Sequence, residues 1–287
     1  MNQLPYIFIL DWDGTCVGNV EFQSQQYSLF ANLKKNGFKP IKTHSIPPAF
    51  YPKSKLVRPG LANFIKSIEE FYPQVYFFIF TASEKNWANT EIPWVEKTND
   101  IKFARPIFTR DDCTNDSAGI NKKSINKIFP KILRAISKNE KYSNTDKHLI
   151  LENNTIVIDN NAVYLDRTDK LLLCPDYHYT VFENLLHGIP IQARKNDRIK
   201  QLLQGYINQG YMCCPPDKNM DVMVSLTEQY KWLSAKCKSI IEDNNNYLND
   251  EFWKILKKLI IQNQVKVYSA SIIKQLQEAV WSHYKKK

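Results

Sequence analysis

Residues 6–15 read YIFILDWDGT, a run of five apolar residues followed directly by two aspartates, a glycine and a threonine. A short, continuous apolar run is typical of a strand that is buried on both faces of a parallel sheet. Asp11 and Asp13 follow this run one residue apart, a spacing that lets both side chains enter one pocket. Ligands of open α/β sheets bind beyond the carboxyl ends of the strands. The stretch therefore predicts a parallel α/β sheet with a site at its carboxyl edge.

The rest of the first half of the chain fits this fold class. Similar apolar runs predict further strands at residues 75–80, 105–110, 154–160 and 170–175. Apolar residues at helical spacing predict helices at 28–38, 58–72 and 121–138, the last one broken or kinked near Pro130. Because strands alternate with helices, we expect parallel β-α-β units with helices on both faces of the sheet.

The pattern changes near residue 177, where amphipathic segments separated by Gly, Pro and Asn begin. One of these segments covers residues 223–244. We therefore predict two domains, an α/β domain at residues 1–190 and an α-helical accessory region at 191–287. The sequence suggests no role for the helical region.

Composition limits the cellular setting and the partners. No apolar run among the 287 residues reaches membrane length, and the N-terminus does not resemble a signal peptide, so we expect an intracellular protein, cytoplasmic or nuclear and not secreted. Six scattered cysteines lack the paired spacing of a zinc site and are interpreted as reduced packing residues. The net charge of +10 favours phosphorylated or polyanionic partners, nucleic acid included, without identifying one. The oligomeric state cannot be inferred.

Polar residues follow three of the predicted strands. Asp11 and Asp13 end the first, Thr81 follows the second, and Asp159 and Asn160 end a later one. Such an oxygen-rich cluster suits Mg²⁺, which also binds phosphate oxygens. A carboxylate beside the cation stays ionised and can act as a nucleophile that forms an aspartyl-phosphate.

Four segments occur in the order of the motifs of the haloacid dehalogenase (HAD) superfamily: DWDGT (11–15), FIFTAS (78–83), NKKSINKIF (121–129) and IVIDNN (156–161). The chain most resembles the branch that dephosphorylates the C-terminal domain (CTD) of RNA polymerase II, the small CTD phosphatase and NLI-interacting-factor group. The features of that branch are the segment 58–83, an R-x-x-C element at 110–113 and the Asp-Asn pair at 159–160. The resemblance covers residues 5 to 180 and implies a HAD-like Rossmannoid sheet.

The resemblance implies a role for each matching residue. Asp11 would attack phosphorus, and Asp13 would serve as general acid and then as general base. Thr81 would bind the phosphoryl oxygens, and Lys123 would offset their charge. The substrate would contact Thr81, Ala82, Ser83, Arg110 and Lys123. Magnesium would be held by Asp11, the backbone carbonyl of Asp13, and Asp159 or Asn160.

The lysine assignment depends on spacing. In the family the lysine is followed by apolar residues two and five positions later. Lys123 meets this pattern with Ile125 and Ile128, whereas Lys122 does not. Gly14 departs from the branch, which usually has Glu there, and the stretch between Thr81 and the R-x-x-C element is longer than expected.

Predicted helices and loops already fill the interval from Thr15 to Thr81 and the 36 residues from Lys123 to Asp159. We therefore expect an open site with no large cap, and at most a small β flap. An open site suits a phosphoprotein, and the leading hypothesis is a phosphatase for phosphoserine or phosphothreonine with a role in transcription. The alternatives are a polynucleotide 3′-phosphatase or nucleotide phosphatase, and a non-catalytic docking module of a transcription complex. Richness in asparagine and lysine suggests a large DNA virus as the source.

Overall fold

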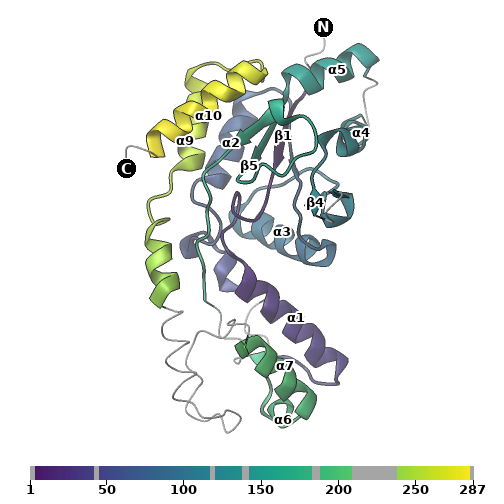
Figure 1. The fold of residues 1–287 in the computed structure, drawn as a ribbon, viewed down its shortest axis with the longest axis vertical. Helices are drawn as coiled ribbons and strands as arrows, with labels where there is room; N and C mark the ends of the chain where they lie inside the picture. Colours follow the sequence, from purple (N-terminus) through teal and green to yellow (C-terminus); the bar gives the residue numbers. More distant parts are fainter. Residues whose placement is uncertain are drawn as a thin grey trace. The chain divides into compact units, whose positions relative to one another are not determined.

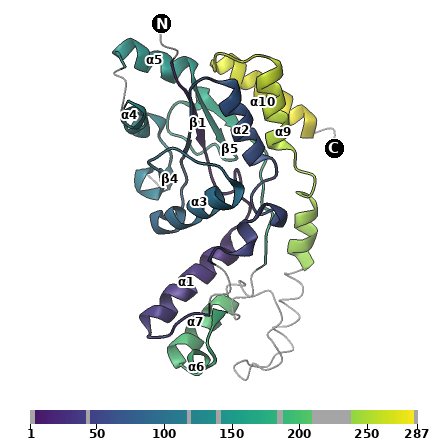
Figure 2. The ribbon, with the colours of Figure 1, turned by 180° about the vertical axis from the view of Figure 1, so that it is seen from behind.

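The computed structural model describes residues 4–41, 45–116, 120–137, 142–182, 188–208 and 238–284. The chain divides into two compact units. The first contains Met1–Gly18, Val57–Tyr177 and Asp250–Lys287, and the second contains Asn19–Leu56 and His178–Asn249. Figures 1 and 2 show the course of the chain from opposite sides. Most of the helix expected at 223–244, with Cys213, Cys214 and Cys237, lies outside the described residues.

A four-stranded parallel sheet in the order β2-β1-β5-β6 forms the centre of the first unit. The strands are β1 (Tyr6–Leu10), β2 (Val75–Ile79), β5 (Thr155–Asp159) and β6 (Leu171–Leu173). They confirm the strands predicted near 5–10, 75–80, 154–160 and 170–175. All five residues of β1 are buried, as a strand covered on both faces requires.

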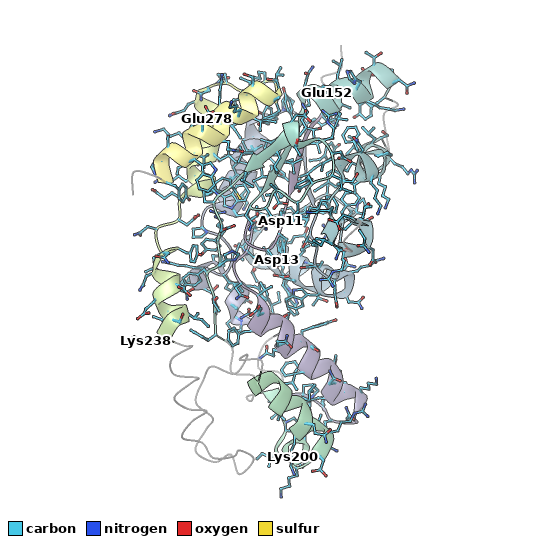
Figure 3. All side chains as sticks on the ribbon, viewed as in Figure 1. Asp11, Asp13, Glu152, Lys200, Lys238 and Glu278 are labelled. Atoms are coloured by element: carbon cyan, nitrogen blue, oxygen red, sulfur yellow. The ribbon has the colours of Figure 1, made fainter. Side chains whose placement is uncertain are left out.

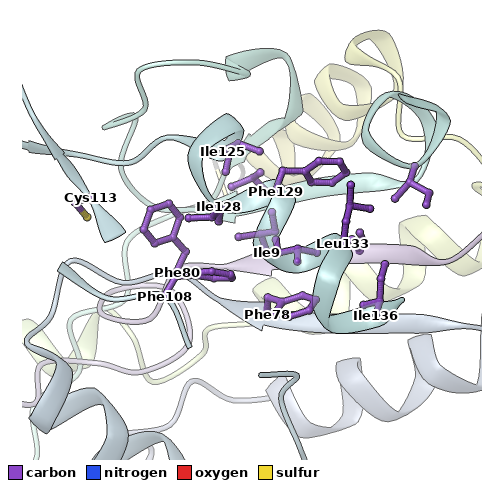
Figure 4. Close-up of a cluster of buried hydrophobic side chains, with 14 residues drawn as sticks. Ile9, Phe78, Phe80, Phe108, Cys113, Ile125, Ile128, Phe129, Leu133 and Ile136 are labelled. Carbon is purple, nitrogen blue, oxygen red and sulfur yellow. The ribbon is translucent and has the colours of Figure 1, made fainter. Parts of the chain in front are cut away.

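Successive residues of β1 point to opposite faces of the sheet, and each face has its own helical cover. On one face Ile7 and Ile9 join a buried cluster with α4 (Ile125–Ile136), shown in Figure 4. On the other face Phe8 packs edge-on against Phe64 of α2 (Leu61–Phe71), with ring centroids 6.0 Å apart. The expected arrangement of helices on both faces is confirmed.

The strand expected at 105–110 is wrong. Phe108 forms only an isolated bridge with Phe80, and a short 3-10 helix, η3 (Arg110–Asp112), follows. Pro106 has no N–H to donate to a ladder, which limits strand pairing in this stretch. The segment still lies along β2, because Phe108 N donates to Ile79 O and Thr81 N donates to Phe108 O.

Several further elements differ from the expectation or were not expected. The helix expected at 121–138 is not broken at Pro130, because α4 runs continuously past this residue; the alternative of a kink there stays a prediction. A second helix, α3 (Lys85–Asn99), follows Thr81, and a hairpin of β3 (Thr114–Asn115) and β4 (Asn121–Lys122) precedes Lys123. Other elements of the first unit are α5 (Asn144–Asn153), η4 (Thr168–Lys170), α9 (Phe252–Gln262) and α10 (Ala270–Tyr284).

The second unit is helical in its described part. It contains α1 (Glu21–Lys35), η1 (Pro48–Phe50), η2 (Pro52–Ser54), α6 (Ile191–Arg194), α7 (Asp197–Asn208) and helical residues 238–245. Its buried cluster consists of Leu29, Leu33, Ile189, Ala193, Ile199 and Leu203. Asn244 joins the two ends of the His178–Asn249 segment, because its side chain exchanges hydrogen bonds with the backbone of Thr180.

The structure bears on two expectations about organisation. Apart from strands β2 and β5 of the central sheet, the described residues between Thr15 and Thr81 form helices and turns, and those between Lys123 and Asp159 form α4 and α5. Neither described interval therefore contains a full α/β cap domain. The two compact units are not separated at residue 190. Helices α9 and α10, which come after this position, belong to the unit that contains the sheet. Within the described part of the chain no helix is long and apolar enough to cross a membrane.

Glu91 provides a test of the packing around α3. Its side chain is fully buried, and the neighbouring Trp12 side chain opposes the effect of burial on its pKa only in part. Burial raises the pKa of Glu91 well above its ordinary value, and the Asp13 carboxylate adds to the rise. Because the folded state then binds the proton more tightly than the unfolded state, stability falls as pH rises above the ordinary glutamate pKa.

We expect Glu91→Gln to lack this loss of stability. Relative to the wild type, its free energy of unfolding should be larger at pH 8 than at pH 5 by about 1 kcal/mol, because the variant avoids the loss; urea unfolding measures it. Glu96→Gln is the matched control, because Glu96 lies on the same helix but accepts hydrogen bonds from Phe103 N and Arg105. The control should destabilise the protein at both pH values. An unchanged pH dependence in Glu91→Gln would contradict the prediction.

Candidate active site

The register of the sheet brings two carboxylates together. Leu10 of β1 pairs with Ile158 of β5, so the residues that follow, Asp11 and Asp159, end neighbouring parallel strands at the same edge. Asp11 N donates to Ile158 O at 2.9 Å and fixes the backbone at this point. Figure 3 shows Asp11 and Asp13 at the end of β1 in the interior of the first unit.

Lys123 lies between the two carboxylates. Its ammonium group donates to Asp11 Oδ1 at 2.5 Å and to Asp159 Oδ2 at 2.7 Å. All three side chains are buried, with exposed fractions of 3% for Lys123, 8% for Asp11 and 0% for Asp159. Ion pairs removed from water depend on such close geometry, because desolvation of each charge costs several kcal/mol.

The chain around Lys123 leaves its backbone little freedom. Lys123 N donates to Val163 O, and Lys123 O accepts from Leu165 N. The next residue, Ser124, caps α4 by accepting from Lys127 N at 3.1 Å. Asp166 adds to this cap by accepting from the first backbone amides of α4, where the helix dipole favours negative charge.

Tyr164 connects the lysine with the Asp159 carboxylate. The Tyr164 hydroxyl donates to Asp159 Oδ2 at 2.9 Å, and the Lys123 ammonium group lies 5.7 Å from the centre of the Tyr164 ring. The ring of Phe80 lies at a similar distance, 5.6 Å, from the same ammonium group. Aromatic faces attract cations, so both rings favour the charged lysine.

Thr15 joins the first motif to the last. Its hydroxyl lies 3.2 Å from Asp11 Oδ2 and 3.0 Å from Asn160 Oδ1, and it accepts from Asn160 N at 3.0 Å. The side-chain amide of Asn160 also donates, through Nδ2, to Asp176 Oδ1. One buried hydroxyl therefore links the second oxygen of Asp11 to Asn160, although the two residues lie on different strand ends.

Asp13 has a separate set of partners. Its Oδ2 accepts from Ser83 Oγ at 2.6 Å and from Thr81 Oγ1 at 3.2 Å, and Ser83 N donates to Thr81 Oγ1. The turn after β2 is thus joined to the end of β1. Of the predicted site residues, the structure brings together Asp11, Asp13, Thr81, Ser83, Lys123, Asp159 and Asn160.

Arg110 and Ala82 are placed differently. Arg110 Nε donates to the Ala82 backbone oxygen at 2.8 Å, and Arg110 Nη1 lies 3.7 Å from Glu84 Oε1. Half of the Arg110 side chain is exposed. Arg110 therefore holds the turn after Thr81 by its backbone, and the partners of its guanidinium group are Ala82 and Glu84 and not Asp11 or Lys123.

Burial dominates the electrostatics of the site. It raises the pKa of Asp11 against the opposing effect of Lys123, and it raises the pKa of Asp13 against the hydrogen bonds from Ser83 and Thr81. Burial alone would lower the pKa of Lys123, but Asp11 and Asp159 outweigh it and the pKa is raised. Lys123 is therefore a cation at neutral pH, while protons bind the aspartates more readily than in water.

The charge of the cluster is suited to a divalent cation. Three carboxylates, Asp11, Asp13 and Asp159, share the single ammonium group of Lys123, which leaves an excess of negative charge when all are ionised. In the described ranges no group of three His, Cys, Asp or Glu side chains forms a metal cage. Two carboxylates with amide and backbone oxygens nevertheless suit Mg²⁺, which binds few protein ligands and keeps several waters.

The sequence reasoning assigned no role to two residues of this network. Thr15 was part of the first motif, but its contact with Asn160 spans 145 residues and has no local signal. Tyr164 lies five residues after Asp159, and an aromatic residue at that position gave no reason to expect a hydrogen bond to the carboxylate. Both partners depend on tertiary structure.

Residues 6–194 match the sequence profile of the NLI interacting factor-like phosphatase family. The chain belongs to this family. The match covers more than half of the chain, and with the parallel sheet it confirms the HAD-like α/β fold. The comparison with curated proteins gives no match.

Similar solved structures include a variant of the fission yeast RNA polymerase II CTD phosphatase Fcp1 bound to beryllium fluoride. It is 15% identical, the match covers 90% of this chain and 62% of that chain, and the TM-score is 0.42. The HAD domain of the effector protein Lem4 from Legionella pneumophila is 13% identical. That match covers 83% of this chain and 97% of the domain, with a TM-score of 0.28.

The excess negative charge predicts that Mg²⁺ stabilises the folded protein. We expect 5–10 mM MgCl₂ to raise the melting temperature by roughly 2–5 °C over a KCl solution of the same ionic strength, since only the folded state assembles the site. Asp159→Asn should lose this increase, because it removes one of the two central carboxylates. Asp112→Asn is the control, since Asp112 pairs with Lys131 on the surface and should retain the full response. An equal response in Asp159→Asn would place the cation elsewhere.

Proposed function

We propose that the chain is a magnesium-dependent phosphatase that hydrolyses phosphoserine or phosphothreonine on a protein, such as the C-terminal domain of RNA polymerase II. The observation that carries the proposal is the buried Asp11 carboxylate, held by Lys123 beside Asp159, with Asp13 two residues further on. Membership of the NLI interacting factor-like phosphatase family supports the same reaction class. The presence of both aspartates and of the buried lysine argues against a purely non-catalytic docking module.

In the first step an Asp11 carboxylate oxygen bonds to phosphorus, and the bond from phosphorus to the serine or threonine oxygen breaks. Asp13 gives its proton to the leaving oxygen, so an alcohol departs rather than an alkoxide. The raised pKa of Asp13, caused by burial, favours the protonated form that this role needs. Asp11 is left as an aspartyl-phosphate.

In the second step Asp13, now a carboxylate, accepts a proton from a water molecule whose oxygen bonds to phosphorus. The bond between phosphorus and the Asp11 oxygen breaks, inorganic phosphate leaves, and both aspartates return to their starting forms. Thr81 and Ser83 already donate to Asp13 and so hold it toward the reacting group. Lys123 offsets negative charge on Asp11 and on the phosphoryl oxygens.

The residues that would hold Mg²⁺ are Asp11, Asp159, Asn160 and the backbone carbonyl of Asp13. When bound there, the cation supplies positive charge that offsets the phosphoryl oxygens. Thr15 supports this set, because its hydroxyl touches both Asp11 and Asn160 and fixes their relative orientation. Tyr164 does the same for Asp159.

A protein substrate fits the construction of the chain better than a small metabolite. The described residues of both intervals between the motifs carry no complete α/β cap domain of the kind that would enclose a small molecule. The net charge of +10 attracts anionic phosphorylated chains over long range.

The direct test measures phosphate release in the presence of Mg²⁺. We expect release from a doubly phosphorylated polymerase-tail peptide at least ten times faster than from a 3′-phosphorylated oligonucleotide of equal concentration. Asp11→Asn should lower turnover by about 1,000-fold or more, since it removes the nucleophile. Asp197→Asn is the control, because Asp197 pairs with Lys200 on the surface of the second unit.

Other outcomes have distinct meanings. Faster release from the oligonucleotide would reject the protein substrate and retain the phosphatase. Turnover of an aryl phosphate that persists in Asp11→Asn would reject the aspartyl-phosphate. Absence of turnover for peptide, oligonucleotide and aryl phosphate alike, in folded protein with Mg²⁺, would support the docking module.

A further inference from the structure

The C-terminal helices α9 and α10 are joined to the interior of the first unit by a buried ion pair. Arg58 donates through Nε to Asp250 Oδ1 at 2.9 Å and through Nη2 to Asp250 Oδ2 at 2.7 Å. The exposed fractions of the two side chains are 0% and 3%. Tyr284, the last residue of α10, also donates to Asp250 Oδ2 at 2.9 Å. This geometry is the bidentate form in which an Arg–carboxylate pair is strongest.

The same arginine contacts the turn that follows Asp11. Arg58 Nη1 donates to Thr15 O at 3.4 Å, and Arg58 N donates to Cys16 O at 2.9 Å. Thr15 is the residue whose hydroxyl joins Asp11 to Asn160. A continuous set of contacts therefore runs from Asp250 through Arg58 and Thr15 to Asp11.

A second set of contacts runs from α10 to Asp159. Leu173 N donates to Gln277 Oε1, and Trp281 Nε1 donates to Leu173 O, at 2.8 and 2.9 Å. Two side chains of α10 therefore form hydrogen bonds with the N–H and the carbonyl of the last residue of the edge strand β6. The next residue, Cys174, donates its N–H to Asp159 O. The second set therefore ends at the backbone of Asp159, whereas the first ends at the carboxylate of Asp11.

We propose that α9 and α10 are part of the catalytic unit, with Asp250 acting as a positioning residue that fixes the turn after Asp11 through Arg58. The expected effect on turnover rests on the proposed function. The expected effect on the backbone of the turn after Asp11 does not. The guanidinium group is fully buried, and aromatic rings of Phe252 and Tyr177 lie 4.5 and 5.2 Å from its carbon. Without Asp250 the arginine would keep its charge in a dry site and would have to move to reach water.

Asp250→Asn tests the proposal because it keeps the shape of the side chain and removes its charge. We expect kcat for an aryl phosphate to fall by at least tenfold, while KM changes less than twofold, because the nucleophile is misplaced in the transition state. Amide hydrogen exchange within residues 12–17 should become at least tenfold faster, and exchange in β2 should stay within twofold of the wild type. Tyr284→Phe should change both readouts in the same direction by a smaller factor.

Glu152→Gln is the matched control. Glu152 forms a bidentate pair with Arg167 in the same unit, at 2.7 and 2.9 Å, but this pair does not include residues of the turn after Asp11. The control should leave kcat and exchange in residues 12–17 unchanged. The proposal is overturned if Asp250→Asn and Tyr284→Phe both leave exchange in residues 12–17 unchanged. If Asp250→Asn does not fold, Tyr284→Phe decides alone.

The exchange measurement separates this proposal from the proposed function. A wild-type chain without turnover, whose residues 12–17 lose protection in Asp250→Asn, would reject the phosphatase and retain the positioning role. Turnover that requires Asp11 but is unchanged in both variants, together with unchanged exchange, would retain the phosphatase and reject the positioning role.

Discussion

The buried contact of Lys123 with Asp11 and Asp159 is the interaction on which the site depends. The two carboxylates end neighbouring parallel strands, so the register that buries Ile9 and Val157 also brings like charges together. Desolvation makes this arrangement costly unless a cation lies between them. Lys123 supplies that cation, and its backbone is fixed by the 163–165 segment and by the cap of α4. The sheet register therefore places the two carboxylates, and the cap of α4 places the lysine that makes their proximity possible.

The parts of the site that could be predicted from the sequence are those that depend on local pattern. Asp11 and Asp159 follow short apolar runs, and a run of that kind ends at the carboxyl edge of a parallel sheet wherever it lies in the chain. Lys123 was distinguished from Lys122 by the spacing of two isoleucines on α4, both of which are buried. The predicted strand at 105–110 failed because hydrophobicity alone does not reveal whether backbone donors are available for a ladder, and Pro106 has none.

The contacts that sequence reasoning missed join residues far apart in the chain. Thr15 and Asn160 are separated by 145 positions, and Arg58 and Asp250 by 192. The sequence around Arg58 gives no sign that this arginine is completely buried, because burial of a charge depends on a partner that only the tertiary structure supplies. In the same way, an amphipathic pattern predicts that α9 and α10 have an apolar face but does not identify what covers it. The structure packs Trp253 of α9 against Phe64 of α2, with ring centroids 4.7 Å apart.

The charge of the whole chain and the charge of the site have opposite signs, and the proposed reaction needs both. The net charge of +10 attracts an anionic phosphorylated partner from a distance, but at the site the carboxylates of Asp11 and Asp159 share one lysine. A phosphate ester would be repelled by those carboxylates at short range, where Coulomb energies in a partly dry pocket far exceed those in water. The positive charge of Lys123 offsets only part of this repulsion. The approach of the substrate to Asp11 therefore requires a further positive charge at the end of β1, which is the physical reason for a divalent cation in the proposed mechanism.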